Sequence, residues 1–137
     1  MGLLDILRVL WNAADSVASL VVQWDPAGCA TEIECRASLQ RFLERKLQPL
    51  HVRESLSEGV PSDLVVQNKV AVAVHGKLDT SADYYRLMGR LAAYRGWHGA
   101  VLVVVTGPVA PELRERVEEY VKSGQDLPAA QFCLLQK

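Results

Sequence analysis

The chain has 137 residues, which is enough for one domain of ordinary size and too few for two independent ones. Half of the residues are hydrophobic and 23% are charged, a balance that argues against a largely disordered protein. The 15 lysines and arginines stand against 16 acidic residues, and the net charge of −1 excludes binding of nucleic acid through bulk positive charge, although not through a local basic groove.

The cysteines and the most apolar stretch of the sequence both bear on location. Cys29, Cys35 and Cys133 contain no CxxC pair and would leave one thiol over in any disulfide scheme, so we expect free thiols and a reduced, cytoplasmic chain. Charged residues interrupt the apolar stretch 3–24, which predicts no membrane span. We expect no signal peptide either, because no basic residue precedes this stretch.

Residues 3–24 are predicted to form a helix that is apolar on most of its circumference. Its polar residues follow steps of three and four along one narrow face: Asp5, Arg8, Asn12, Asp15, Ser19 and Gln23. The apolar arc is wider than the ~100° that covers one side of a core. The helix is therefore either buried deeply in its own domain or shared with a second copy. We predict that residues 1–30 are the oligomerisation element of a homodimer and that residues 31–137 form the main domain.

The rest of the chain alternates between helix and strand signals. A helix is predicted from Thr31 to Leu47, where Thr31 and Glu34 have the spacing of a capping box. Its predicted buried stripe consists of Ile33, Leu39, Leu43 and Leu47. The elements that follow are predicted as strands 51–57, 63–67 and 70–75, a helix 81–94, a strand 100–105, a helix 111–122 that opens at Pro111, and an edge strand 131–136. This pattern predicts an α/β domain.

Two short segments carry a resemblance to a known family. Pro61-Ser62-Asp63 comes shortly before Val70-Ala71-Val72-Ala73-Val74-His75-Gly76-Lys77. Together with the order of helix, three antiparallel strands, helix and strand, these segments resemble the PD-(D/E)xK nuclease superfamily over residues 31–137. The resemblance implies a restriction-endonuclease-like core with a mixed sheet flanked by helices, to which the first helix is an addition.

The resemblance also implies a chemistry. In this family an Asp opens the second core strand, where Asp63 stands, and a Glu or Asp and a Lys lie two residues apart on the third strand. Two such residues point to the same side of a strand, so both reach one Mg²⁺ or Mn²⁺ ion that activates water against a phosphodiester. Many members carry a further acidic residue on the preceding helix, where Glu32 or Glu34 stands. We take Asp63 and Glu34 as the candidate metal ligands.

The third strand departs from the family pattern. One register places Ala73 at the carboxylate position and His75 at the lysine position, and a shift by two places His75 and Lys77 there instead. The second carboxylate is missing in both registers. A His could act as a base near pH 7, but it prefers softer metals than Mg²⁺. We therefore predict a degenerate active site with Asp63, Glu34, His75 and Lys77 as the candidate catalytic residues.

Positive charge is concentrated in the middle of the sequence. Residues 59–107 carry five cations against three anions, whereas residues 1–30 carry one cation against three anions. Arg86 and Arg90 lie one turn apart on a predicted helix, and Arg95 follows them. These three arginines are the candidate ligands for nucleic acid, and the alternative is an ordinary solvated helix face.

Three functions remain open from the sequence. The first is a degenerate nuclease-like domain that acts as a nucleic-acid-associated or protein-interaction module without a certain cofactor. The second is an active nuclease that uses Mg²⁺ or Mn²⁺ with a variant active site. The third is a purely structural interaction protein.

Overall fold

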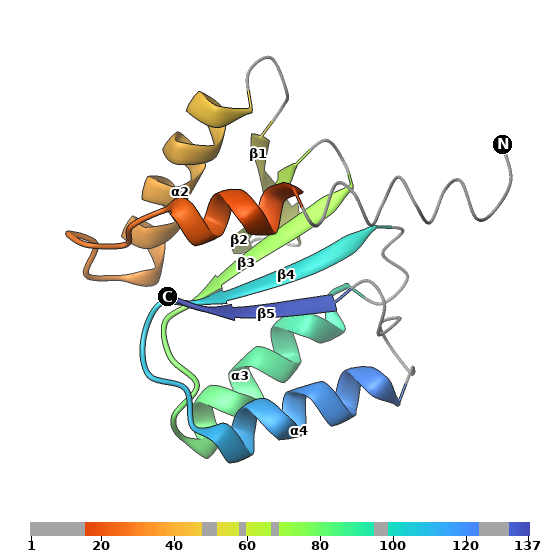
Figure 1. The fold of residues 1–137 in the computed structure, drawn as a ribbon. Coiled ribbons are helices and arrows are strands. Elements are labelled where there is room, and N and C mark those ends of the chain that lie inside the picture. The colour runs from red at the N-terminus through yellow and green to blue at the C-terminus, as the bar shows by residue number, and fades with distance from the viewer. Residues whose placement is uncertain (1–15, 48–51, 58–59, 67–68, 95–98, 124–131) are drawn as a thin grey trace, which may run out of the picture.

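A mixed sheet of five strands, in the order β1-β2-β3-β4-β5, forms the centre of the molecule (Figure 1). The structure is a computed structural model that describes residues 16–47, 52–57, 60–66, 69–94, 99–123 and 132–137, with the backbone alone described for 52–57 and 60–63. The strands are β1 (Val52–Ser57), β2 (Val60–Val66), β3 (Val70–His75), β4 (Ala100–Val105) and β5 (Phe132–Gln136).

The sheet is antiparallel on one side of β3 and parallel on the other. β1 pairs with β2 and β2 pairs with β3 in antiparallel fashion, whereas β3 pairs with β4 and β4 with β5 in parallel. The parallel pairs require crossovers, which the helices α3 (Ser81–Ala92) and α4 (Pro111–Lys122) supply. The expected α/β class and the expected element order are confirmed, and β5 is an edge strand as predicted.

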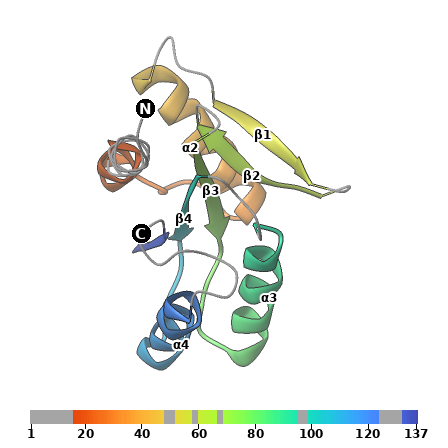
Figure 2. The same cartoon turned by 90° about the vertical axis from the view of Figure 1, so that its right-hand side faces the viewer.

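Helices cover both faces of the sheet (Figure 2). The helix at residues 16–23 and α2 (Glu32–Lys46) lie on one face, and α3 and α4 lie on the other. Alternate residues of β3 enter the two cores: Val72 and Val74 pack on the α2 side, whereas Ala71 and Ala73 pack on the α3 and α4 side. A strand buried on both faces has no polar alternation, which is why β3 and β4 appear in the sequence as continuous apolar runs.

The helix starts follow the capping signals in the sequence. The Thr31 hydroxyl accepts the Glu34 N–H at 3.1 Å, and the Glu34 carboxylate accepts the N–H of Ala30 at 2.8 Å. The predicted cap of α2 is therefore present, although the carboxylate reaches one residue further back than in the standard capping box. Thr80 and Asp83 form a full capping box at α3, and Pro111 opens α4 as predicted.

Two expectations about side chains are wrong. Ile33, expected in the buried stripe of α2, is 69% exposed, and Cys35 is buried in its place. The stripe of α2 runs through Cys35, Leu39 and Leu43 in steps of four, which leaves Ile33 on the solvent side.

The second wrong expectation concerns the thiols. Cys29 and Cys35 form a disulfide across six positions of sequence, and Cys133 is the free cysteine. A link over so short a loop stabilises a fold by about 2 kcal/mol through the entropy of the unfolded chain. The disulfide also removes the argument from reduced thiols that supported a cytoplasmic location.

The two crossover loops meet at the carboxyl ends of β3 and β4. Thr106 N–H donates to the carbonyl of His75 at 3.0 Å, and Leu78 N–H donates to the carbonyl of Pro108 at 2.9 Å. A Cβ on Gly107 would collide with the carbonyl oxygen of Gly76, so only glycine fits there.

Among the residues described, no helix has the length and apolarity needed to span a membrane.

Candidate functional site

Charged and titratable side chains converge at the carboxyl end of β3. Glu32 comes from the first turn of α2, His75 ends β3, and Arg86 and Arg90 lie one turn apart on α3. Because α2 and α3 cover opposite faces of the sheet, these residues can meet only at the end of a strand. We call Glu32, His75, Arg86 and Arg90 the β3-end cluster.

Glu32 is the centre of the β3-end cluster. Its Oε1 accepts the Gly76 N–H at 2.6 Å and lies 2.8 Å from Arg86 Nη2, while its Oε2 lies 3.7 Å from Arg90 Nη1. Partial burial raises the pKa of this carboxyl, but the hydrogen bonds from Arg86 and Gly76 and the charges of the two arginines outweigh burial and leave the pKa lowered. Glu32 is therefore an ionised carboxylate that already has its counter-ions.

His75 is fully buried and held in its neutral form. Its side chain is 0% exposed, and Arg90 Nη1 lies 3.2 Å from its Nδ1. Since a guanidinium only donates, Nδ1 must accept, and the proton of the neutral ring is on Nε2. Burial, followed by the charges of Arg86 and Arg90, lowers the pKa of His75 from 6.5 to about 4, against an opposing effect of Glu32. His75 Nε2 has no partner at ordinary hydrogen-bond geometry among the described residues, although the backbone of Asp83 lies near enough to the ring to oppose the lowering of the pKa.

The two arginines have different surroundings. Arg90 has a side chain only 16% exposed, and its Nη1 donates to the carbonyl of Val74 at 2.8 Å as well as to His75. Arg90 thus ties α3 to the end of β3. Arg86 is 49% exposed and forms its ion pair with Glu32 at 2.8 Å. Two of the three arginines predicted to bind nucleic acid, Arg86 and Arg90, are therefore engaged within the protein.

Of the other predicted site residues, Glu34 and Lys77 have no described contact with this cluster, and the Asp63 side chain and Arg95 are outside the described residues. Glu34 is exposed and caps α2 through the N–H of Ala30. Lys77 is exposed on the loop after β3. The backbone of Asp63 pairs with Ala73, two residues before His75, but its side chain lies outside the described residues, as does all of Arg95.

The acidic residue that reaches the site is Glu32 rather than Glu34. The sequence contained a signal for this choice in the cap itself. A carboxylate at the third helical position folds back onto the cap backbone, so the predicted capping box already occupied Glu34 and left Glu32 available. The proximity of Glu32 to the end of β3 could not be predicted from the sequence, because it depends on how α2 crosses the sheet.

The described groups do not fit a hard divalent cation. Mg²⁺ requires several oxygen ligands in octahedral array, whereas Glu32 is bound by an amide and a guanidinium, and Ala73, which pairs with Asp63 across the sheet, offers no ligand. His75 Nδ1 already accepts from Arg90. In the described part of the chain, no three His, Cys, Asp or Glu side chains gather as a metal site.

An open cleft of about 490 Å³ adjoins the β3-end cluster. Its walls are the segment 25–30, the start of α2, and the two crossover loops at Gly76 and Gly107. Both half-cystines line it, so the disulfide holds one wall of the cleft against α2. The cleft lies beyond the carboxyl ends of β3 and β4, the edge where α/β proteins place ligands.

Comparison of the chain with models of protein families, with curated proteins and with solved structures finds no match.

Proposed function

We propose that this chain is a PD-(D/E)xK nuclease-like domain that has lost metal-dependent cleavage and binds nucleic acid without cutting it. The support for the family is the succession of α2, a three-strand antiparallel meander, α3 and a parallel strand, with Asp63 on β2 and His75 on β3. A second support is Glu32, which comes from the helix before the sheet and reaches the end of β3.

The observation that carries the loss of cleavage is the set of partners around Glu32. A metal-binding carboxylate must present free lone pairs to the cation, whereas Glu32 is hydrogen bonded to Gly76 and ion paired with Arg86. Arg86 and Arg90 supply the positive charge that a metal ion would otherwise supply, and His75 has a pKa too low to carry charge near pH 7. The cluster is thus an ion-paired structural element in which the two arginines outnumber the one carboxylate.

Metal and cleavage assays test this proposal directly. Calorimetric titration with Mg²⁺ or Mn²⁺ is expected to show no binding at millimolar metal, and single- and double-stranded DNA and RNA are expected to stay intact. Wild-type binding to the same nucleic acids without cutting would support the module. Metal-dependent cleavage that Asp63→Ala and Glu32→Gln both abolish would contradict the loss of activity and establish the variant nuclease.

Association of two copies through the N-terminal helix remains a proposal of its own. Within the described part of this helix, Val17 and Val21 are buried in the α2-side core, whereas Val22 is 59% exposed. We expect a dimer mass by size exclusion with light scattering, and Val22→Lys is expected to shift it toward the monomer. Ser19→Lys on the polar side of the same helix is the control, and a wild-type monomer at micromolar concentration would contradict the dimer.

A further inference from the structure

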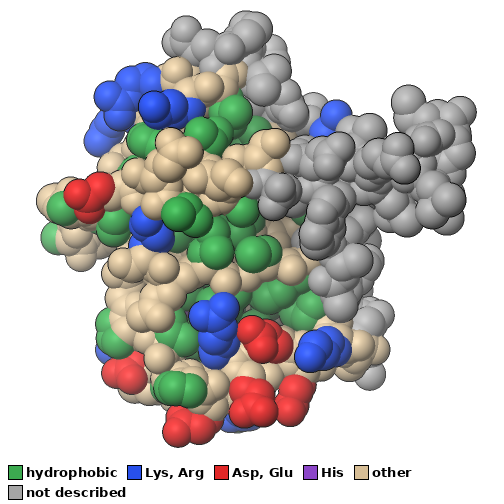
Figure 3. All heavy atoms as spheres, in the orientation of Figure 1, with side chains coloured by type: hydrophobic (Ala, Val, Ile, Leu, Met, Phe, Trp, Pro, Cys, Tyr) green, Lys and Arg blue, Asp and Glu red, His purple; other side chains and the backbone are tan. Residues whose placement is uncertain are grey.

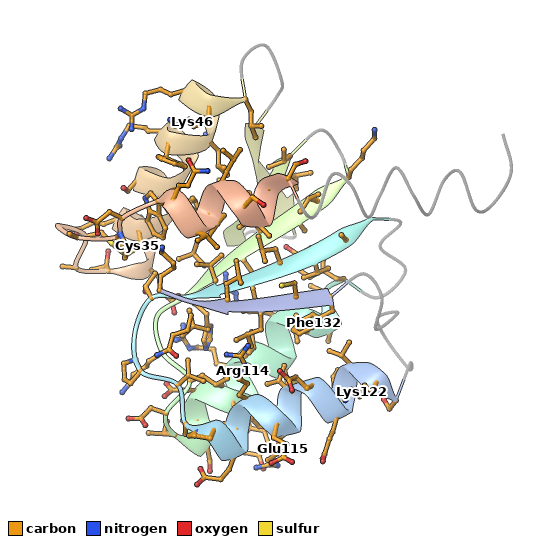
Figure 4. All side chains as sticks on the ribbon, viewed as in Figure 1. Cys35, Lys46, Arg114, Glu115, Lys122 and Phe132 are labelled. Atoms are coloured by element: carbon orange, nitrogen blue, oxygen red, sulfur yellow. A yellow bond between two sulfur atoms is a disulfide. The ribbon has the colours of Figure 1, made fainter. Side chains whose placement is uncertain are left out.

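The exposed cations at the end of α2 form a surface separate from the β3-end cluster. Arg41, Arg45 and Lys46 lie in the last two turns of this helix and are all exposed. Figure 3 shows a group of Lys and Arg side chains over this end of α2, at the place where Figure 4 labels Lys46. We call these three residues the α2 basic end.

The α2 basic end keeps its charge available to a partner. None of the three forms an ion pair with a carboxylate of the described residues, and Lys46 has its ammonium 5.7 Å from the ring of Phe42. Glu44, the acidic residue of this part of the helix, is hydrogen bonded by Gln40 at 3.1 Å. Arg41 and Arg45 are four residues apart and thus neighbours on one side of the helix.

This surface contrasts with the arginines predicted from the sequence. Arg86 and Arg90 face the carboxylate of Glu32, so a phosphate that used them would have to displace an existing ion pair. A phosphate at the α2 basic end displaces only water and counter-ions, which is the favourable source of protein–nucleic acid affinity.

We infer that the α2 basic end is the contact surface for the phosphodiester backbone of nucleic acid, an inference that rests on the proposed nucleic-acid-binding function. The helical rise of about 1.5 Å per residue places it about 14 to 21 Å from Glu32 along the axis of α2, so a strand bound there can extend toward the cleft at the other end of the helix.

An anionic membrane is the competing partner for a basic helix end. Membrane-surface helices pair their cations with exposed apolar side chains that enter the lipid. The large exposed hydrophobic residues in the described part of the chain are Val22, Ile33 and Tyr85, and none lies in the α2 basic end. The surface therefore favours backbone phosphates without insertion.

The experiment measures the affinity of the full chain for labelled single- and double-stranded DNA and RNA across a salt series. Three phosphate contacts on a duplex are expected to weaken binding about 40-fold between about 50 mM and about 200 mM salt. Combined Arg41→Gln, Arg45→Gln and Lys46→Gln is expected to remove most of this dependence and to lower low-salt affinity by about tenfold or more. Circular dichroism and thermal unfolding check that the variant is folded.

A matched pair of single changes separates position from charge. Lys46→Gln and Lys122→Gln each remove one exposed cation at the last residue of a helix, α2 and α4 respectively. The inference requires weaker binding for Lys46→Gln only. Equal losses for the two variants, or a triple variant that binds like the wild type, would overturn the α2 contact while leaving nucleic-acid binding in place.

Two further outcomes test whether the chain binds nucleic acid at all and whether the partner is instead a membrane. A wild-type chain that binds none of the nucleic acids would overturn the proposed function together with this inference. Vesicles of phosphatidylserine and phosphatidylcholine form a parallel arm, and tighter salt-dependent binding to them than to nucleic acid, lost in the triple variant, would assign the surface to a membrane instead.

Discussion

Acidification from about pH 6.5 to about pH 4 is expected to destabilise the folded protein by about 3 kcal/mol through His75. The unfolded chain protonates this histidine near its ordinary pKa of 6.5, whereas burial and the two arginines lower the pKa in the folded state to about 4. Between these values the unfolded state binds more protons, so the free energy of unfolding falls as the pH falls.

The other charged groups at the site do not reverse this direction. Glu32, Arg86 and Arg90 face His75, and the pKa of Glu32 is lowered because its hydrogen bonds and the two arginine charges outweigh its burial, so its contribution to stability also falls as the pH falls. Asp83, whose backbone lies near the ring, likewise has a lowered pKa, because its hydrogen bonds outweigh its burial.

Urea unfolding of the wild type and of His75→Asn, measured at several pH values, isolates the contribution of His75. The asparagine oxygen can accept from Arg90 as Nδ1 does, but it does not titrate. The wild type is expected to lose about 2 kcal/mol between about pH 7 and about pH 5, and the variant is expected to lose much less. If the variant does not fold, NMR titration of the wild-type ring decides the question, and a pKa near 6.5 would contradict the buried neutral histidine.

Removing the charge of Glu32 has the second largest expected effect. Glu32→Gln is expected to lower the free energy of unfolding by about 2 to 3 kcal/mol, since the carboxylate takes hydrogen bonds from Gly76 and Arg86 and offsets the partly buried Arg90. The same change frees Arg86, so we expect nucleic-acid affinity at low salt to rise even though stability falls.

Glu34→Gln is the matched control because it removes the same charge two residues away in the same helical turn. Glu34 is exposed and serves only as a cap on the described contacts, so a loss below about 1 kcal/mol and unchanged affinity are expected. Chemical denaturation and the binding assay provide both readouts. Equal effects of the two substitutions would contradict the central position of Glu32.

The two buried strands and the helix starts could be predicted from the sequence because they depend on local signals. Continuous apolar runs placed β3 and β4 at their observed bounds, and Pro111 placed the start of α4. Ile33 was assigned to the core wrongly because hydrophobicity alone does not say which side of a first turn faces the sheet.

The net charge of −1 does not tell which cations of the folded chain are paired with a carboxylate and which are exposed to a partner. The α/β class, the element order and the cap that occupies Glu34 could all be predicted from the amino-acid order. The pairing of Glu32 with Arg86 and Arg90 and the bond between Cys29 and Cys35 became visible in the folded chain alone. Caps and apolar periodicity depend on residues a few positions apart in the sequence, whereas an ion pair between opposite faces of a sheet depends on where whole helices cross it.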